Sequence, residues 1–198
     1  MQWVVFDVGG VLLDWHGGVK NVSQYLNVDR EKLLGSLGKI ICQMEKGDIS
    51  PVDGWQEIIN DLDIKDSPKK VLKVWLDGCT WLPEVWELVK DLNDSVYKLA
   101  ICSNNWRGIT KDFWSLNPNM SLFKEIIDSS TEGVRKPDVE LFRIVEKRLD
   151  TQGKGIYFIE DTEENCLAAR NIDWQVHYFE LLDDKGKTSC NKIRKDLL

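Results

Sequence analysis

The chain is poor in histidine and has no long apolar run, and each absence excludes a class of protein. Its 198 residues include two histidines, His16 and His177, from which no Ser/His/Asp triad can be assembled. No stretch approaches ~18 consecutive apolar residues, so we expect no transmembrane helix and no membrane partner. The segment Met1-Gln2-Trp3 lacks the basic and apolar regions of a signal peptide, which favours a cytoplasmic protein.

Cysteine spacing and net charge argue against further classes of protein. The five cysteines are widely spaced and include no C-x-x-C pair, so we expect free thiols in a reducing compartment rather than disulfides or a zinc site. The net charge of −7, from 33 acidic and 26 basic residues, argues against nucleic-acid binding. A small anionic substrate remains possible, because one cation and a few local bases can reverse the field inside a cleft.

The apolar pattern predicts an α/β core interrupted by a helical insertion. Residues 3–7 are expected to form a buried strand, and residues 19–76 several short helices. After residues 77–82, which resemble a return linker, strands alternate with helices; this implies a parallel sheet covered on both faces, a three-layer α/β/α Rossmann-like fold. The expected elements are helices at 83–92, 139–149 and 163–170 and strands at 97–102, 126–127, 155–159 and 175–179, with a short final helix in the charged tail.

A helix start inside the insertion is marked by its own residues. The segment from Gly47 to Pro51 breaks the preceding helical pattern. We expect Ser50 to be the N-cap of the next helix and Pro51 to occupy its first position.

Polar side chains stand where the predicted strands end and at the entry to one helix. These residues are Asp7, Ser103, Asn104, Lys136, Glu160 and Asp161. The carboxyl ends of parallel strands share one edge of the sheet, where open α/β folds bind ligands. Carboxylates with a backbone carbonyl suit Mg²⁺, while a lysine, a hydroxyl and loop amides suit phosphate oxygens. The set fits phosphoryl transfer, in which catalysis is mostly positioning and charge neutralisation.

Four motifs occur in a fixed order along the chain. They are Phe6-Asp7-Val8-Gly9-Gly10-Val11, Ile101-Cys102-Ser103-Asn104, Lys136-Pro137-Asp138 and the run from Phe158 to Asn165. With them, the chain from about residue 3 to 180 resembles the phosphatase branch of the haloacid dehalogenase superfamily. The segment Met44 to Ser50 resembles the E-x-G-x-[IL]-[ST] signature of that branch's small helical cap. The resemblance implies a core at 1–17 and 83–198 and an all-helical cap at 18–82, inserted after the first strand.

The resemblance also implies a role for each matching residue. Asp7 would attack phosphorus and become an aspartyl-phosphate, with Lys136 as the second catalytic residue, offsetting negative charge. The resemblance implies that phosphate is bound by Ser103, Asn104 and Lys136. It implies that Mg²⁺ is held by Asp7, Asp161 and the backbone carbonyl of Gly9. Glu160 and Asn165 are implied to support these metal ligands.

Gly9 departs from the family pattern. Phosphatases of this family usually carry an aspartate there, two residues after the nucleophile, as a general acid/base that contributes ~10²–10⁴-fold. Its loss disfavours a phosphomutase and predicts weak turnover of esters with poor leaving groups, unless Asp14 or His16 replaces it. Aryl phosphates and sugar 1-phosphates should suffer less. Some family members with D-x-G-[GN]-V at this motif resemble sugar-phosphate phosphatases, so inactivity does not follow from Gly9, and this chain resembles those of the glucose-1-phosphate type.

We therefore expect a Mg²⁺-dependent phosphatase of a small phosphorylated metabolite, a sugar phosphate, that is a monomer or homodimer. One alternative is a weakly active or inactive member that binds a ligand or protein; Gly9 and the exposed-looking Trp15 and Trp106 would fit it. Another is a 2-haloacid dehalogenase, which also lacks the second aspartate but uses no metal; the pair Glu160-Asp161 argues against it. The candidate specificity residues are Trp15, His16, Lys20, Met44 and Trp106.

Overall fold

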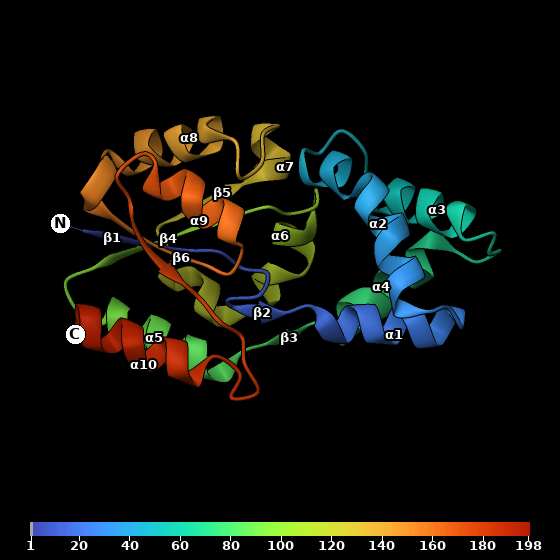
Figure 1. Cartoon of the computed structure of the whole chain (residues 1–198), viewed down its shortest axis with the longest axis horizontal. Helices are drawn as coiled ribbons and strands as arrows, with labels where there is room; N and C mark the ends of the chain where they lie inside the picture. Colours follow the sequence, from blue (N-terminus) through green and yellow to red (C-terminus); the bar gives the residue numbers. More distant parts are fainter. Residues whose placement is uncertain (1) are drawn as a thin grey trace.

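A five-stranded parallel sheet forms the centre of the protein, seen in a computed structural model that describes residues 2–198 (Figure 1). The strand order is β5-β4-β1-β6-β7, and every neighbouring pair is parallel. The strands are β1 (Trp3–Phe6), β4 (Lys98–Ser103), β5 (Glu125–Asp128), β6 (Ile156–Glu160) and β7 (Gln175–Tyr178). The first strand is therefore central, with β4 and β6 on either side of it.

Helices cover both faces of this sheet, as the alternating pattern predicted (Figure 1). One face carries α5 (Pro83–Asn93) and α10 (Lys187–Leu197), and the other carries α8 (Val139–Leu149) and α9 (Glu163–Arg170). Successive β1 residues point to opposite faces, so Val4 and Phe6 join one core and Trp3 and Val5 the other. Burial on both faces explains why β1 reads as an unbroken apolar run.

Four further helices form a unit beyond the carboxyl edge of the sheet, which we term the helical bundle (Figure 1). They are α1 (His16–Leu26), α2 (Arg30–Glu45), α3 (Pro51–Asp61) and α4 (Pro68–Gly78). A two-stranded antiparallel ribbon joins the bundle to the core: β2 (Leu13–Asp14) pairs with β3 (Thr80–Trp81). The bundle occupies most of the segment 18–82 predicted to be a cap, but α1 begins earlier, and the expected linker 77–82 contains the end of α4 and strand β3.

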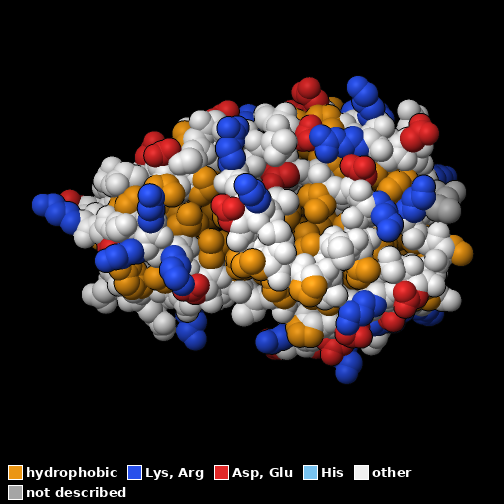
Figure 2. All heavy atoms as spheres, turned by 180° about the vertical axis from the view of Figure 1, so that it is seen from behind, with side chains coloured by type: hydrophobic (Ala, Val, Ile, Leu, Met, Phe, Trp, Pro, Cys, Tyr) orange, Lys and Arg blue, Asp and Glu red, His pale blue; other side chains and the backbone are white. Residues whose placement is uncertain are grey.

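The shorter elements lie around the sheet. They are α6 (Ile109–Asp112), α7 (Ser129–Glu132) and three 3₁₀ helices at Trp114–Leu116, Pro118–Leu122 and Gly153–Gly155. All five cysteines are free thiols, as expected. Within residues 2–198, no helix has the length and apolar character needed to cross a membrane. On the face opposite to that of Figure 1, hydrophobic side chains lie among basic and acidic ones (Figure 2).

The start of α3 confirms the predicted cap. Ser50 is the N-cap and Pro51 the first helical residue, and the Asp53 backbone N–H donates to Ser50 Oγ at 3.1 Å. Helix α4 begins with the same Ser-Pro pair, Ser67 and Pro68. In this described segment, however, the Ser67 side chain accepts no such hydrogen bond.

Candidate active site

The structure brings the polar strand-end residues together at the carboxyl edge of the sheet. Asp7 follows β1 directly, and its backbone N–H donates to the Ile159 carbonyl of β6 at 2.9 Å. Ser103 is the last residue of β4, and Glu160 is the last residue of β6 rather than the first after it. Both are buried. The central strand and its two neighbours thus place three of the predicted residues side by side.

Lys136 is fully buried at the centre of this cluster. Its Nζ donates to the Cys102 carbonyl at 2.9 Å and to Glu160 Oε2 at 2.6 Å, and lies 2.9 Å from Asp7 Oδ1. Burial alone would lower the pKa of Lys136, but the Asp7 and Glu160 carboxylates outweigh it and raise the pKa above its usual value. The lysine is therefore held as a cation against the Asp7 carboxylate.

Asn104 fixes the backbone of that lysine. The Lys136 N–H donates to Asn104 Oδ1 at 2.8 Å, and Asn104 Nδ2 donates to the Lys136 carbonyl at 3.0 Å. The Asn104 side chain thus has a positioning role that sequence reasoning did not assign. Ser103 and Asn104 line the same cavity as Asp7, and their binding of phosphate stays a prediction.

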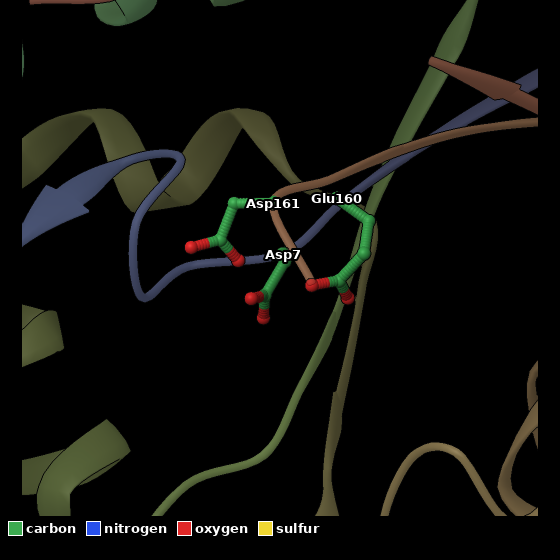
Figure 3. Close-up of side chains that lie close together, drawn as sticks. All are labelled: Asp7, Glu160 and Asp161. Carbon is green, nitrogen blue, oxygen red and sulfur yellow. The ribbon is translucent and has the colours of Figure 1, made fainter. Parts of the chain in front are cut away.

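Three carboxylates meet beside the lysine. Figure 3 shows the Asp7 carboxylate between those of Asp161 and Glu160, and one oxygen from each lies within 4.8 Å of the others. Burial raises the pKa of Asp7 to about 6, a rise that Lys136 limits. Burial, followed by the charges of Asp7 and Glu160, raises the pKa of Asp161 to about 8.

This cluster fits a hard divalent cation. Three acids face one lysine, and the charges of Asp7 and Glu160 add to the effect of burial in raising the pKa of Asp161. Glu160 is occupied at both oxygens, since Oε2 pairs with Lys136 and Oε1 accepts from the Thr162 N–H at 2.9 Å. Asp7 and Asp161 are therefore the carboxylates placed to face a cation, and carboxylate oxygens are what Mg²⁺ prefers.

The glycine pair after β1 shapes the loop around these acids. Gly10 has φ +83°, and a Cβ there would lie 1.9 Å from Asp161 Oδ2. Only glycine therefore allows the loop to approach Asp161 so closely. Gly9 differs, because a Cβ there would meet only Trp15 Cδ1, at an ordinary 3.6 Å.

A cavity of about 600 Å³ extends from the carboxylates towards the helical bundle. Trp15 and Trp106 line it, whereas Met44, Lys20 and His16 do not. Met44 is fully buried within the bundle and Lys20 is exposed to solvent, so neither faces the cavity. The expectation that Trp106 is exposed is wrong: only 8% of it is accessible, because the bundle and the core pack on it together.

Several lining residues escaped sequence reasoning. Glu45, at the end of α2, accepts a hydrogen bond from Arg135 Nε at 2.6 Å, and its backbone carbonyl accepts one from Ser129 Oγ at 2.6 Å. Burial raises the pKa of Glu45, which Arg135 partly offsets. Glu45 belongs to the cap signature, but its partners lie far along the chain and no local pattern marks them. Thr162 and Glu164 line the cavity beside Asn165.

Comparison with known proteins places this arrangement in a family. The model of the haloacid dehalogenase-like hydrolases matches residues 4–178. The chain belongs to this family. The sesquiterpene phosphatase astK of Aspergillus oryzae is 27% identical over 175 residues, which cover 85% of this chain and 84% of that protein.

Solved structures of this family share the fold. An enzyme of Bacteroides thetaiotaomicron, crystallised with magnesium and inorganic phosphate, has a TM-score of 0.76 at 22% identity, covering 93% of this chain and 96% of its own. A hydrolase of Porphyromonas gingivalis has a TM-score of 0.78 at 19% identity and covers 100% of this chain and 98% of its own. The resemblance read from four motifs is thereby confirmed, and with it the three-layer fold.

The two residues considered as replacements for the missing family acid contact each other. His16 Nδ1 lies 2.9 Å from Asp14 Oδ1, which also accepts from the His16 backbone N–H at 2.9 Å. The His16 ring stacks on Trp15, with ring centroids 4.3 Å apart. Neither residue lines the cavity, so their placement does not favour a role as general acid.

Proposed function

We propose that the protein is a Mg²⁺-dependent phosphatase that forms an aspartyl-phosphate on Asp7. The observation that carries this proposal is the position of the Asp7 carboxylate, which lines the cavity 2.9 Å from the buried ammonium group of Lys136. The relative named a sesquiterpene phosphatase supports the reaction type. The name of that relative refers to a sesquiterpene, an apolar compound, as the substrate class, whereas the sequence motifs of this chain favoured a sugar phosphate.

The reaction takes two displacements at phosphorus. An Asp7 oxygen forms a bond to phosphorus while the bond from phosphorus to the ester oxygen breaks, and that oxygen leaves with the electron pair. Water then attacks the same phosphorus, the bond to Asp7 breaks, and inorganic phosphate departs. The water proton passes to solvent or to the departed alkoxide, so the net reaction is ester plus water to alcohol plus phosphate.

The chain's own residues supply most of what these steps need. Lys136 offsets the charge of Asp7, while Ser103 and the Asn104 backbone are proposed to hold phosphate oxygens. Mg²⁺, held by Asp7, Asp161 and the Gly9 carbonyl, would neutralise phosphate charge. The helical bundle would act as the cap that excludes water from the cavity during transfer.

The dehalogenase alternative is less well supported. Halide release needs no magnesium ligand, yet Asp161 stands with a ligand oxygen within 4.8 Å of Asp7. Asp161 is half-buried, and burial together with the charges of Asp7 and Glu160 raises its pKa to about 8; a bound cation would favour its ionised form. The acidic cluster therefore favours the metal-dependent reaction.

The test is hydrolysis of p-nitrophenyl phosphate by wild type and Asp7→Asn, each with Mg²⁺ and with EDTA. We expect turnover by the wild type with Mg²⁺ and loss of at least about 10³-fold in the other three cases. The amide of Asp7→Asn keeps the side-chain size and removes the nucleophile. Turnover by Asp7→Asn at the wild-type rate, or by wild type in EDTA, would overturn the proposal.

A further inference from the structure

The cavity is chemically divided between its two ends. The sheet end carries Asp7, Lys136 and Asp161, together with the polar residues of the neighbouring loops. The bundle end is lined by apolar side chains. Those from the bundle helices are Leu34, Leu37, Ile41, Trp75 and Leu76. A molecule that fills the cavity therefore meets charge at one end only.

Tryptophan rings continue the apolar wall from the bundle to the core. Trp15 stacks on Trp75 with ring centroids 6.3 Å apart, and Trp75 lies 5.6 Å from Trp106. Fully buried Trp55 packs behind both Trp75 and Trp106. Large aromatic rings held in this way offer apolar contact area to a ligand at little conformational cost. On the face shown in Figure 2, by comparison, hydrophobic side chains are interspersed with basic and acidic ones.

Free polar partners are scarce at the bundle end. Among the described residues that the four bundle helices contribute to the lining, Glu45 is the one with an ionisable side chain, and it is paired with Arg135 at 2.6 Å. The neighbouring Cys79 thiol donates to the Trp75 carbonyl at 3.4 Å. A sugar would bring several hydroxyls into this space, and buried hydroxyls without partners oppose binding.

We propose that the substrate is a phosphorylated apolar alcohol whose hydrocarbon chain occupies the bundle end while its terminal phosphoryl group reaches Asp7. This inference rests on the phosphatase proposed above and names its substrate class. Each methylene moved from water into the cavity strengthens binding by about four-fold. The cavity volume of about 600 Å³ lies in the range that encloses whole organic ligands.

The monophosphate and the diphosphate of such an alcohol both fit this description, and they differ in their leaving groups. From a monophosphate, the P–O bond breaks to release an alkoxide that must take a proton. From a diphosphate, attack at the terminal phosphorus releases an organic monophosphate, an anion that departs without protonation. Gly9 supplies no acid, so we expect the diphosphate to be hydrolysed faster than the monophosphate. The hydrocarbon chain of either substrate would occupy the same end of the cavity.

The first experiment is a chain-length series measured on the whole protein with Mg²⁺. Hydrolysis of n-alkyl phosphates from ethyl to dodecyl, of geranyl and farnesyl mono- and diphosphates, and of glucose 1-phosphate is followed by phosphate release. We expect kcat/KM to rise about four-fold per methylene until the cavity is full, and to be lower for glucose 1-phosphate than for the long-chain esters. A flat series, or a preference for the sugar phosphate, would overturn the substrate class.

Binding is measured separately from turnover. The non-hydrolysable n-alkylphosphonates of the same lengths are titrated by tryptophan fluorescence, and the Kd should fall with chain length in the same steps. If p-nitrophenyl phosphate is hydrolysed but the Kd values do not depend on length, the inference fails and the phosphatase stands. If the phosphonates bind with the expected trend and no ester is hydrolysed, the phosphatase fails and the apolar cavity stands.

A cavity-filling variant with a matched control tests where the hydrocarbon chain of the substrate binds. Gly38 lines the cavity, and a Cβ there would meet no atom within 4 Å. Gly35, one turn earlier on α2, is equally open and does not line the cavity. We expect Gly38→Leu to lower kcat/KM for dodecyl phosphate by about tenfold or more and to move the optimum to shorter chains. Gly35→Leu should leave the profile unchanged. Equal profiles for both variants would overturn the placement.

Discussion

At the level of single residues, Gly9 is the position that most restricts the chemistry. Its Cβ direction is open, with Trp15 Cδ1 at 3.6 Å, and it is not among the glycines with positive φ. Neither sterics nor backbone conformation therefore requires glycine here, in contrast to Gly10. The local structure would therefore accept an aspartate at position 9.

Restoring that acid gives a direct prediction. In Gly9→Asp, a carboxyl group beside the cavity should protonate poor leaving groups, a function that contributes ~10²–10⁴-fold where the acid is well placed. We expect the ratio of kcat/KM for ethyl phosphate to that for p-nitrophenyl phosphate to rise at least about tenfold. Gly9→Asn adds the same bulk without the acid and should leave the ratio unchanged. An equal rise in both variants would contradict the acid's role.

Site residues could be predicted from the sequence where the neighbouring residues in the chain mark them. A buried run that ends in Asp7-Val8-Gly9 marks a strand end, and the same holds for Ser103. The ion pair between Lys136 and Glu160 joins residues 24 positions apart, so it depends on how the strands are arranged. The burial of Trp106 likewise follows from contact between bundle and core, which no local pattern records.

At the level of elements, the end of α2 joins the bundle to the core. Glu45 pairs with Arg135, and Ser129 Oγ donates to the Glu45 carbonyl. The next turn is equally close, because a Cβ on Gly47 (φ +72°) would lie 2.3 Å from the Ser130 carbonyl oxygen. The cap signature read from the sequence is thus a contact between two parts of the fold.

Removing Arg135 should make stability depend on pH in a defined direction. In the wild type, burial raises the pKa of Glu45 and Arg135 partly offsets this, so Arg135→Gln should raise the pKa further. A carboxyl whose pKa is higher in the folded state loses stability as pH rises. We expect Arg135→Gln to cost about 1–3 kcal/mol in urea unfolding near pH 7, and less near pH 4, where Glu45 is largely protonated in both states.

The control for this prediction is Arg143→Gln. Its partner Glu146 keeps hydrogen bonds from Trp174 Nε1 at 3.0 Å and from the Gly153 N–H at 3.2 Å. Its cost should therefore vary less with pH. A pH-independent cost for Arg135→Gln would mean that Glu45 is not ionised in the wild type.

The two Ser-Pro helix starts provide a matched pair. Ser50 caps α3 through its side chain, whereas in the described structure Ser67 does not cap α4 in this way. Ser50→Ala should lower the free energy of unfolding by about 1 kcal/mol, and Ser67→Ala by clearly less, both measured by urea unfolding. Equal losses would show that the observed hydrogen bond is not what stabilises α3.

Element boundaries were predictable to different degrees. Helices α8 and α9 begin and end where the sequence places them, since their apolar periodicity and N-terminal residues agree. The ribbon of β2 and β3 was missed, because two-residue strands show no periodicity. The apolar side of α2 was visible, but spacing alone does not tell a face packed in a core from one that lines a cavity.

At the level of the whole molecule, charge is unevenly placed. The chain carries a net charge of −7, and three of its acids, two of them buried and one half-buried, meet beside a single lysine. Such a concentration opposes folding unless a cation binds. The ion proposed for catalysis should therefore also act on the stability of the entire fold.

Metal removal should expose this linkage. At about one hundred times its Kd, a ligand that binds only the folded state adds about 2.7 kcal/mol, which raises the Tm of a domain of this size by about 5–10 °C. We expect that rise on adding Mg²⁺ to EDTA-treated wild type. In Asp161→Asn the rise should be small. An undiminished rise in that variant would place the ion elsewhere.

The β2–β3 ribbon has a consequence for how such a protein can change over time. Leu13 pairs with Trp81 and Asp14 with Thr80, so the chain leaves the core and re-enters it at adjacent points. A change in the length or sequence of the segment between them leaves the order of the sheet strands as it is, provided that contacts with the core such as Glu45 with Arg135 are kept. The ribbon makes the bundle a separable module, so that substrate choice can evolve, or be engineered by grafting, while the machinery of phosphoryl transfer is inherited intact.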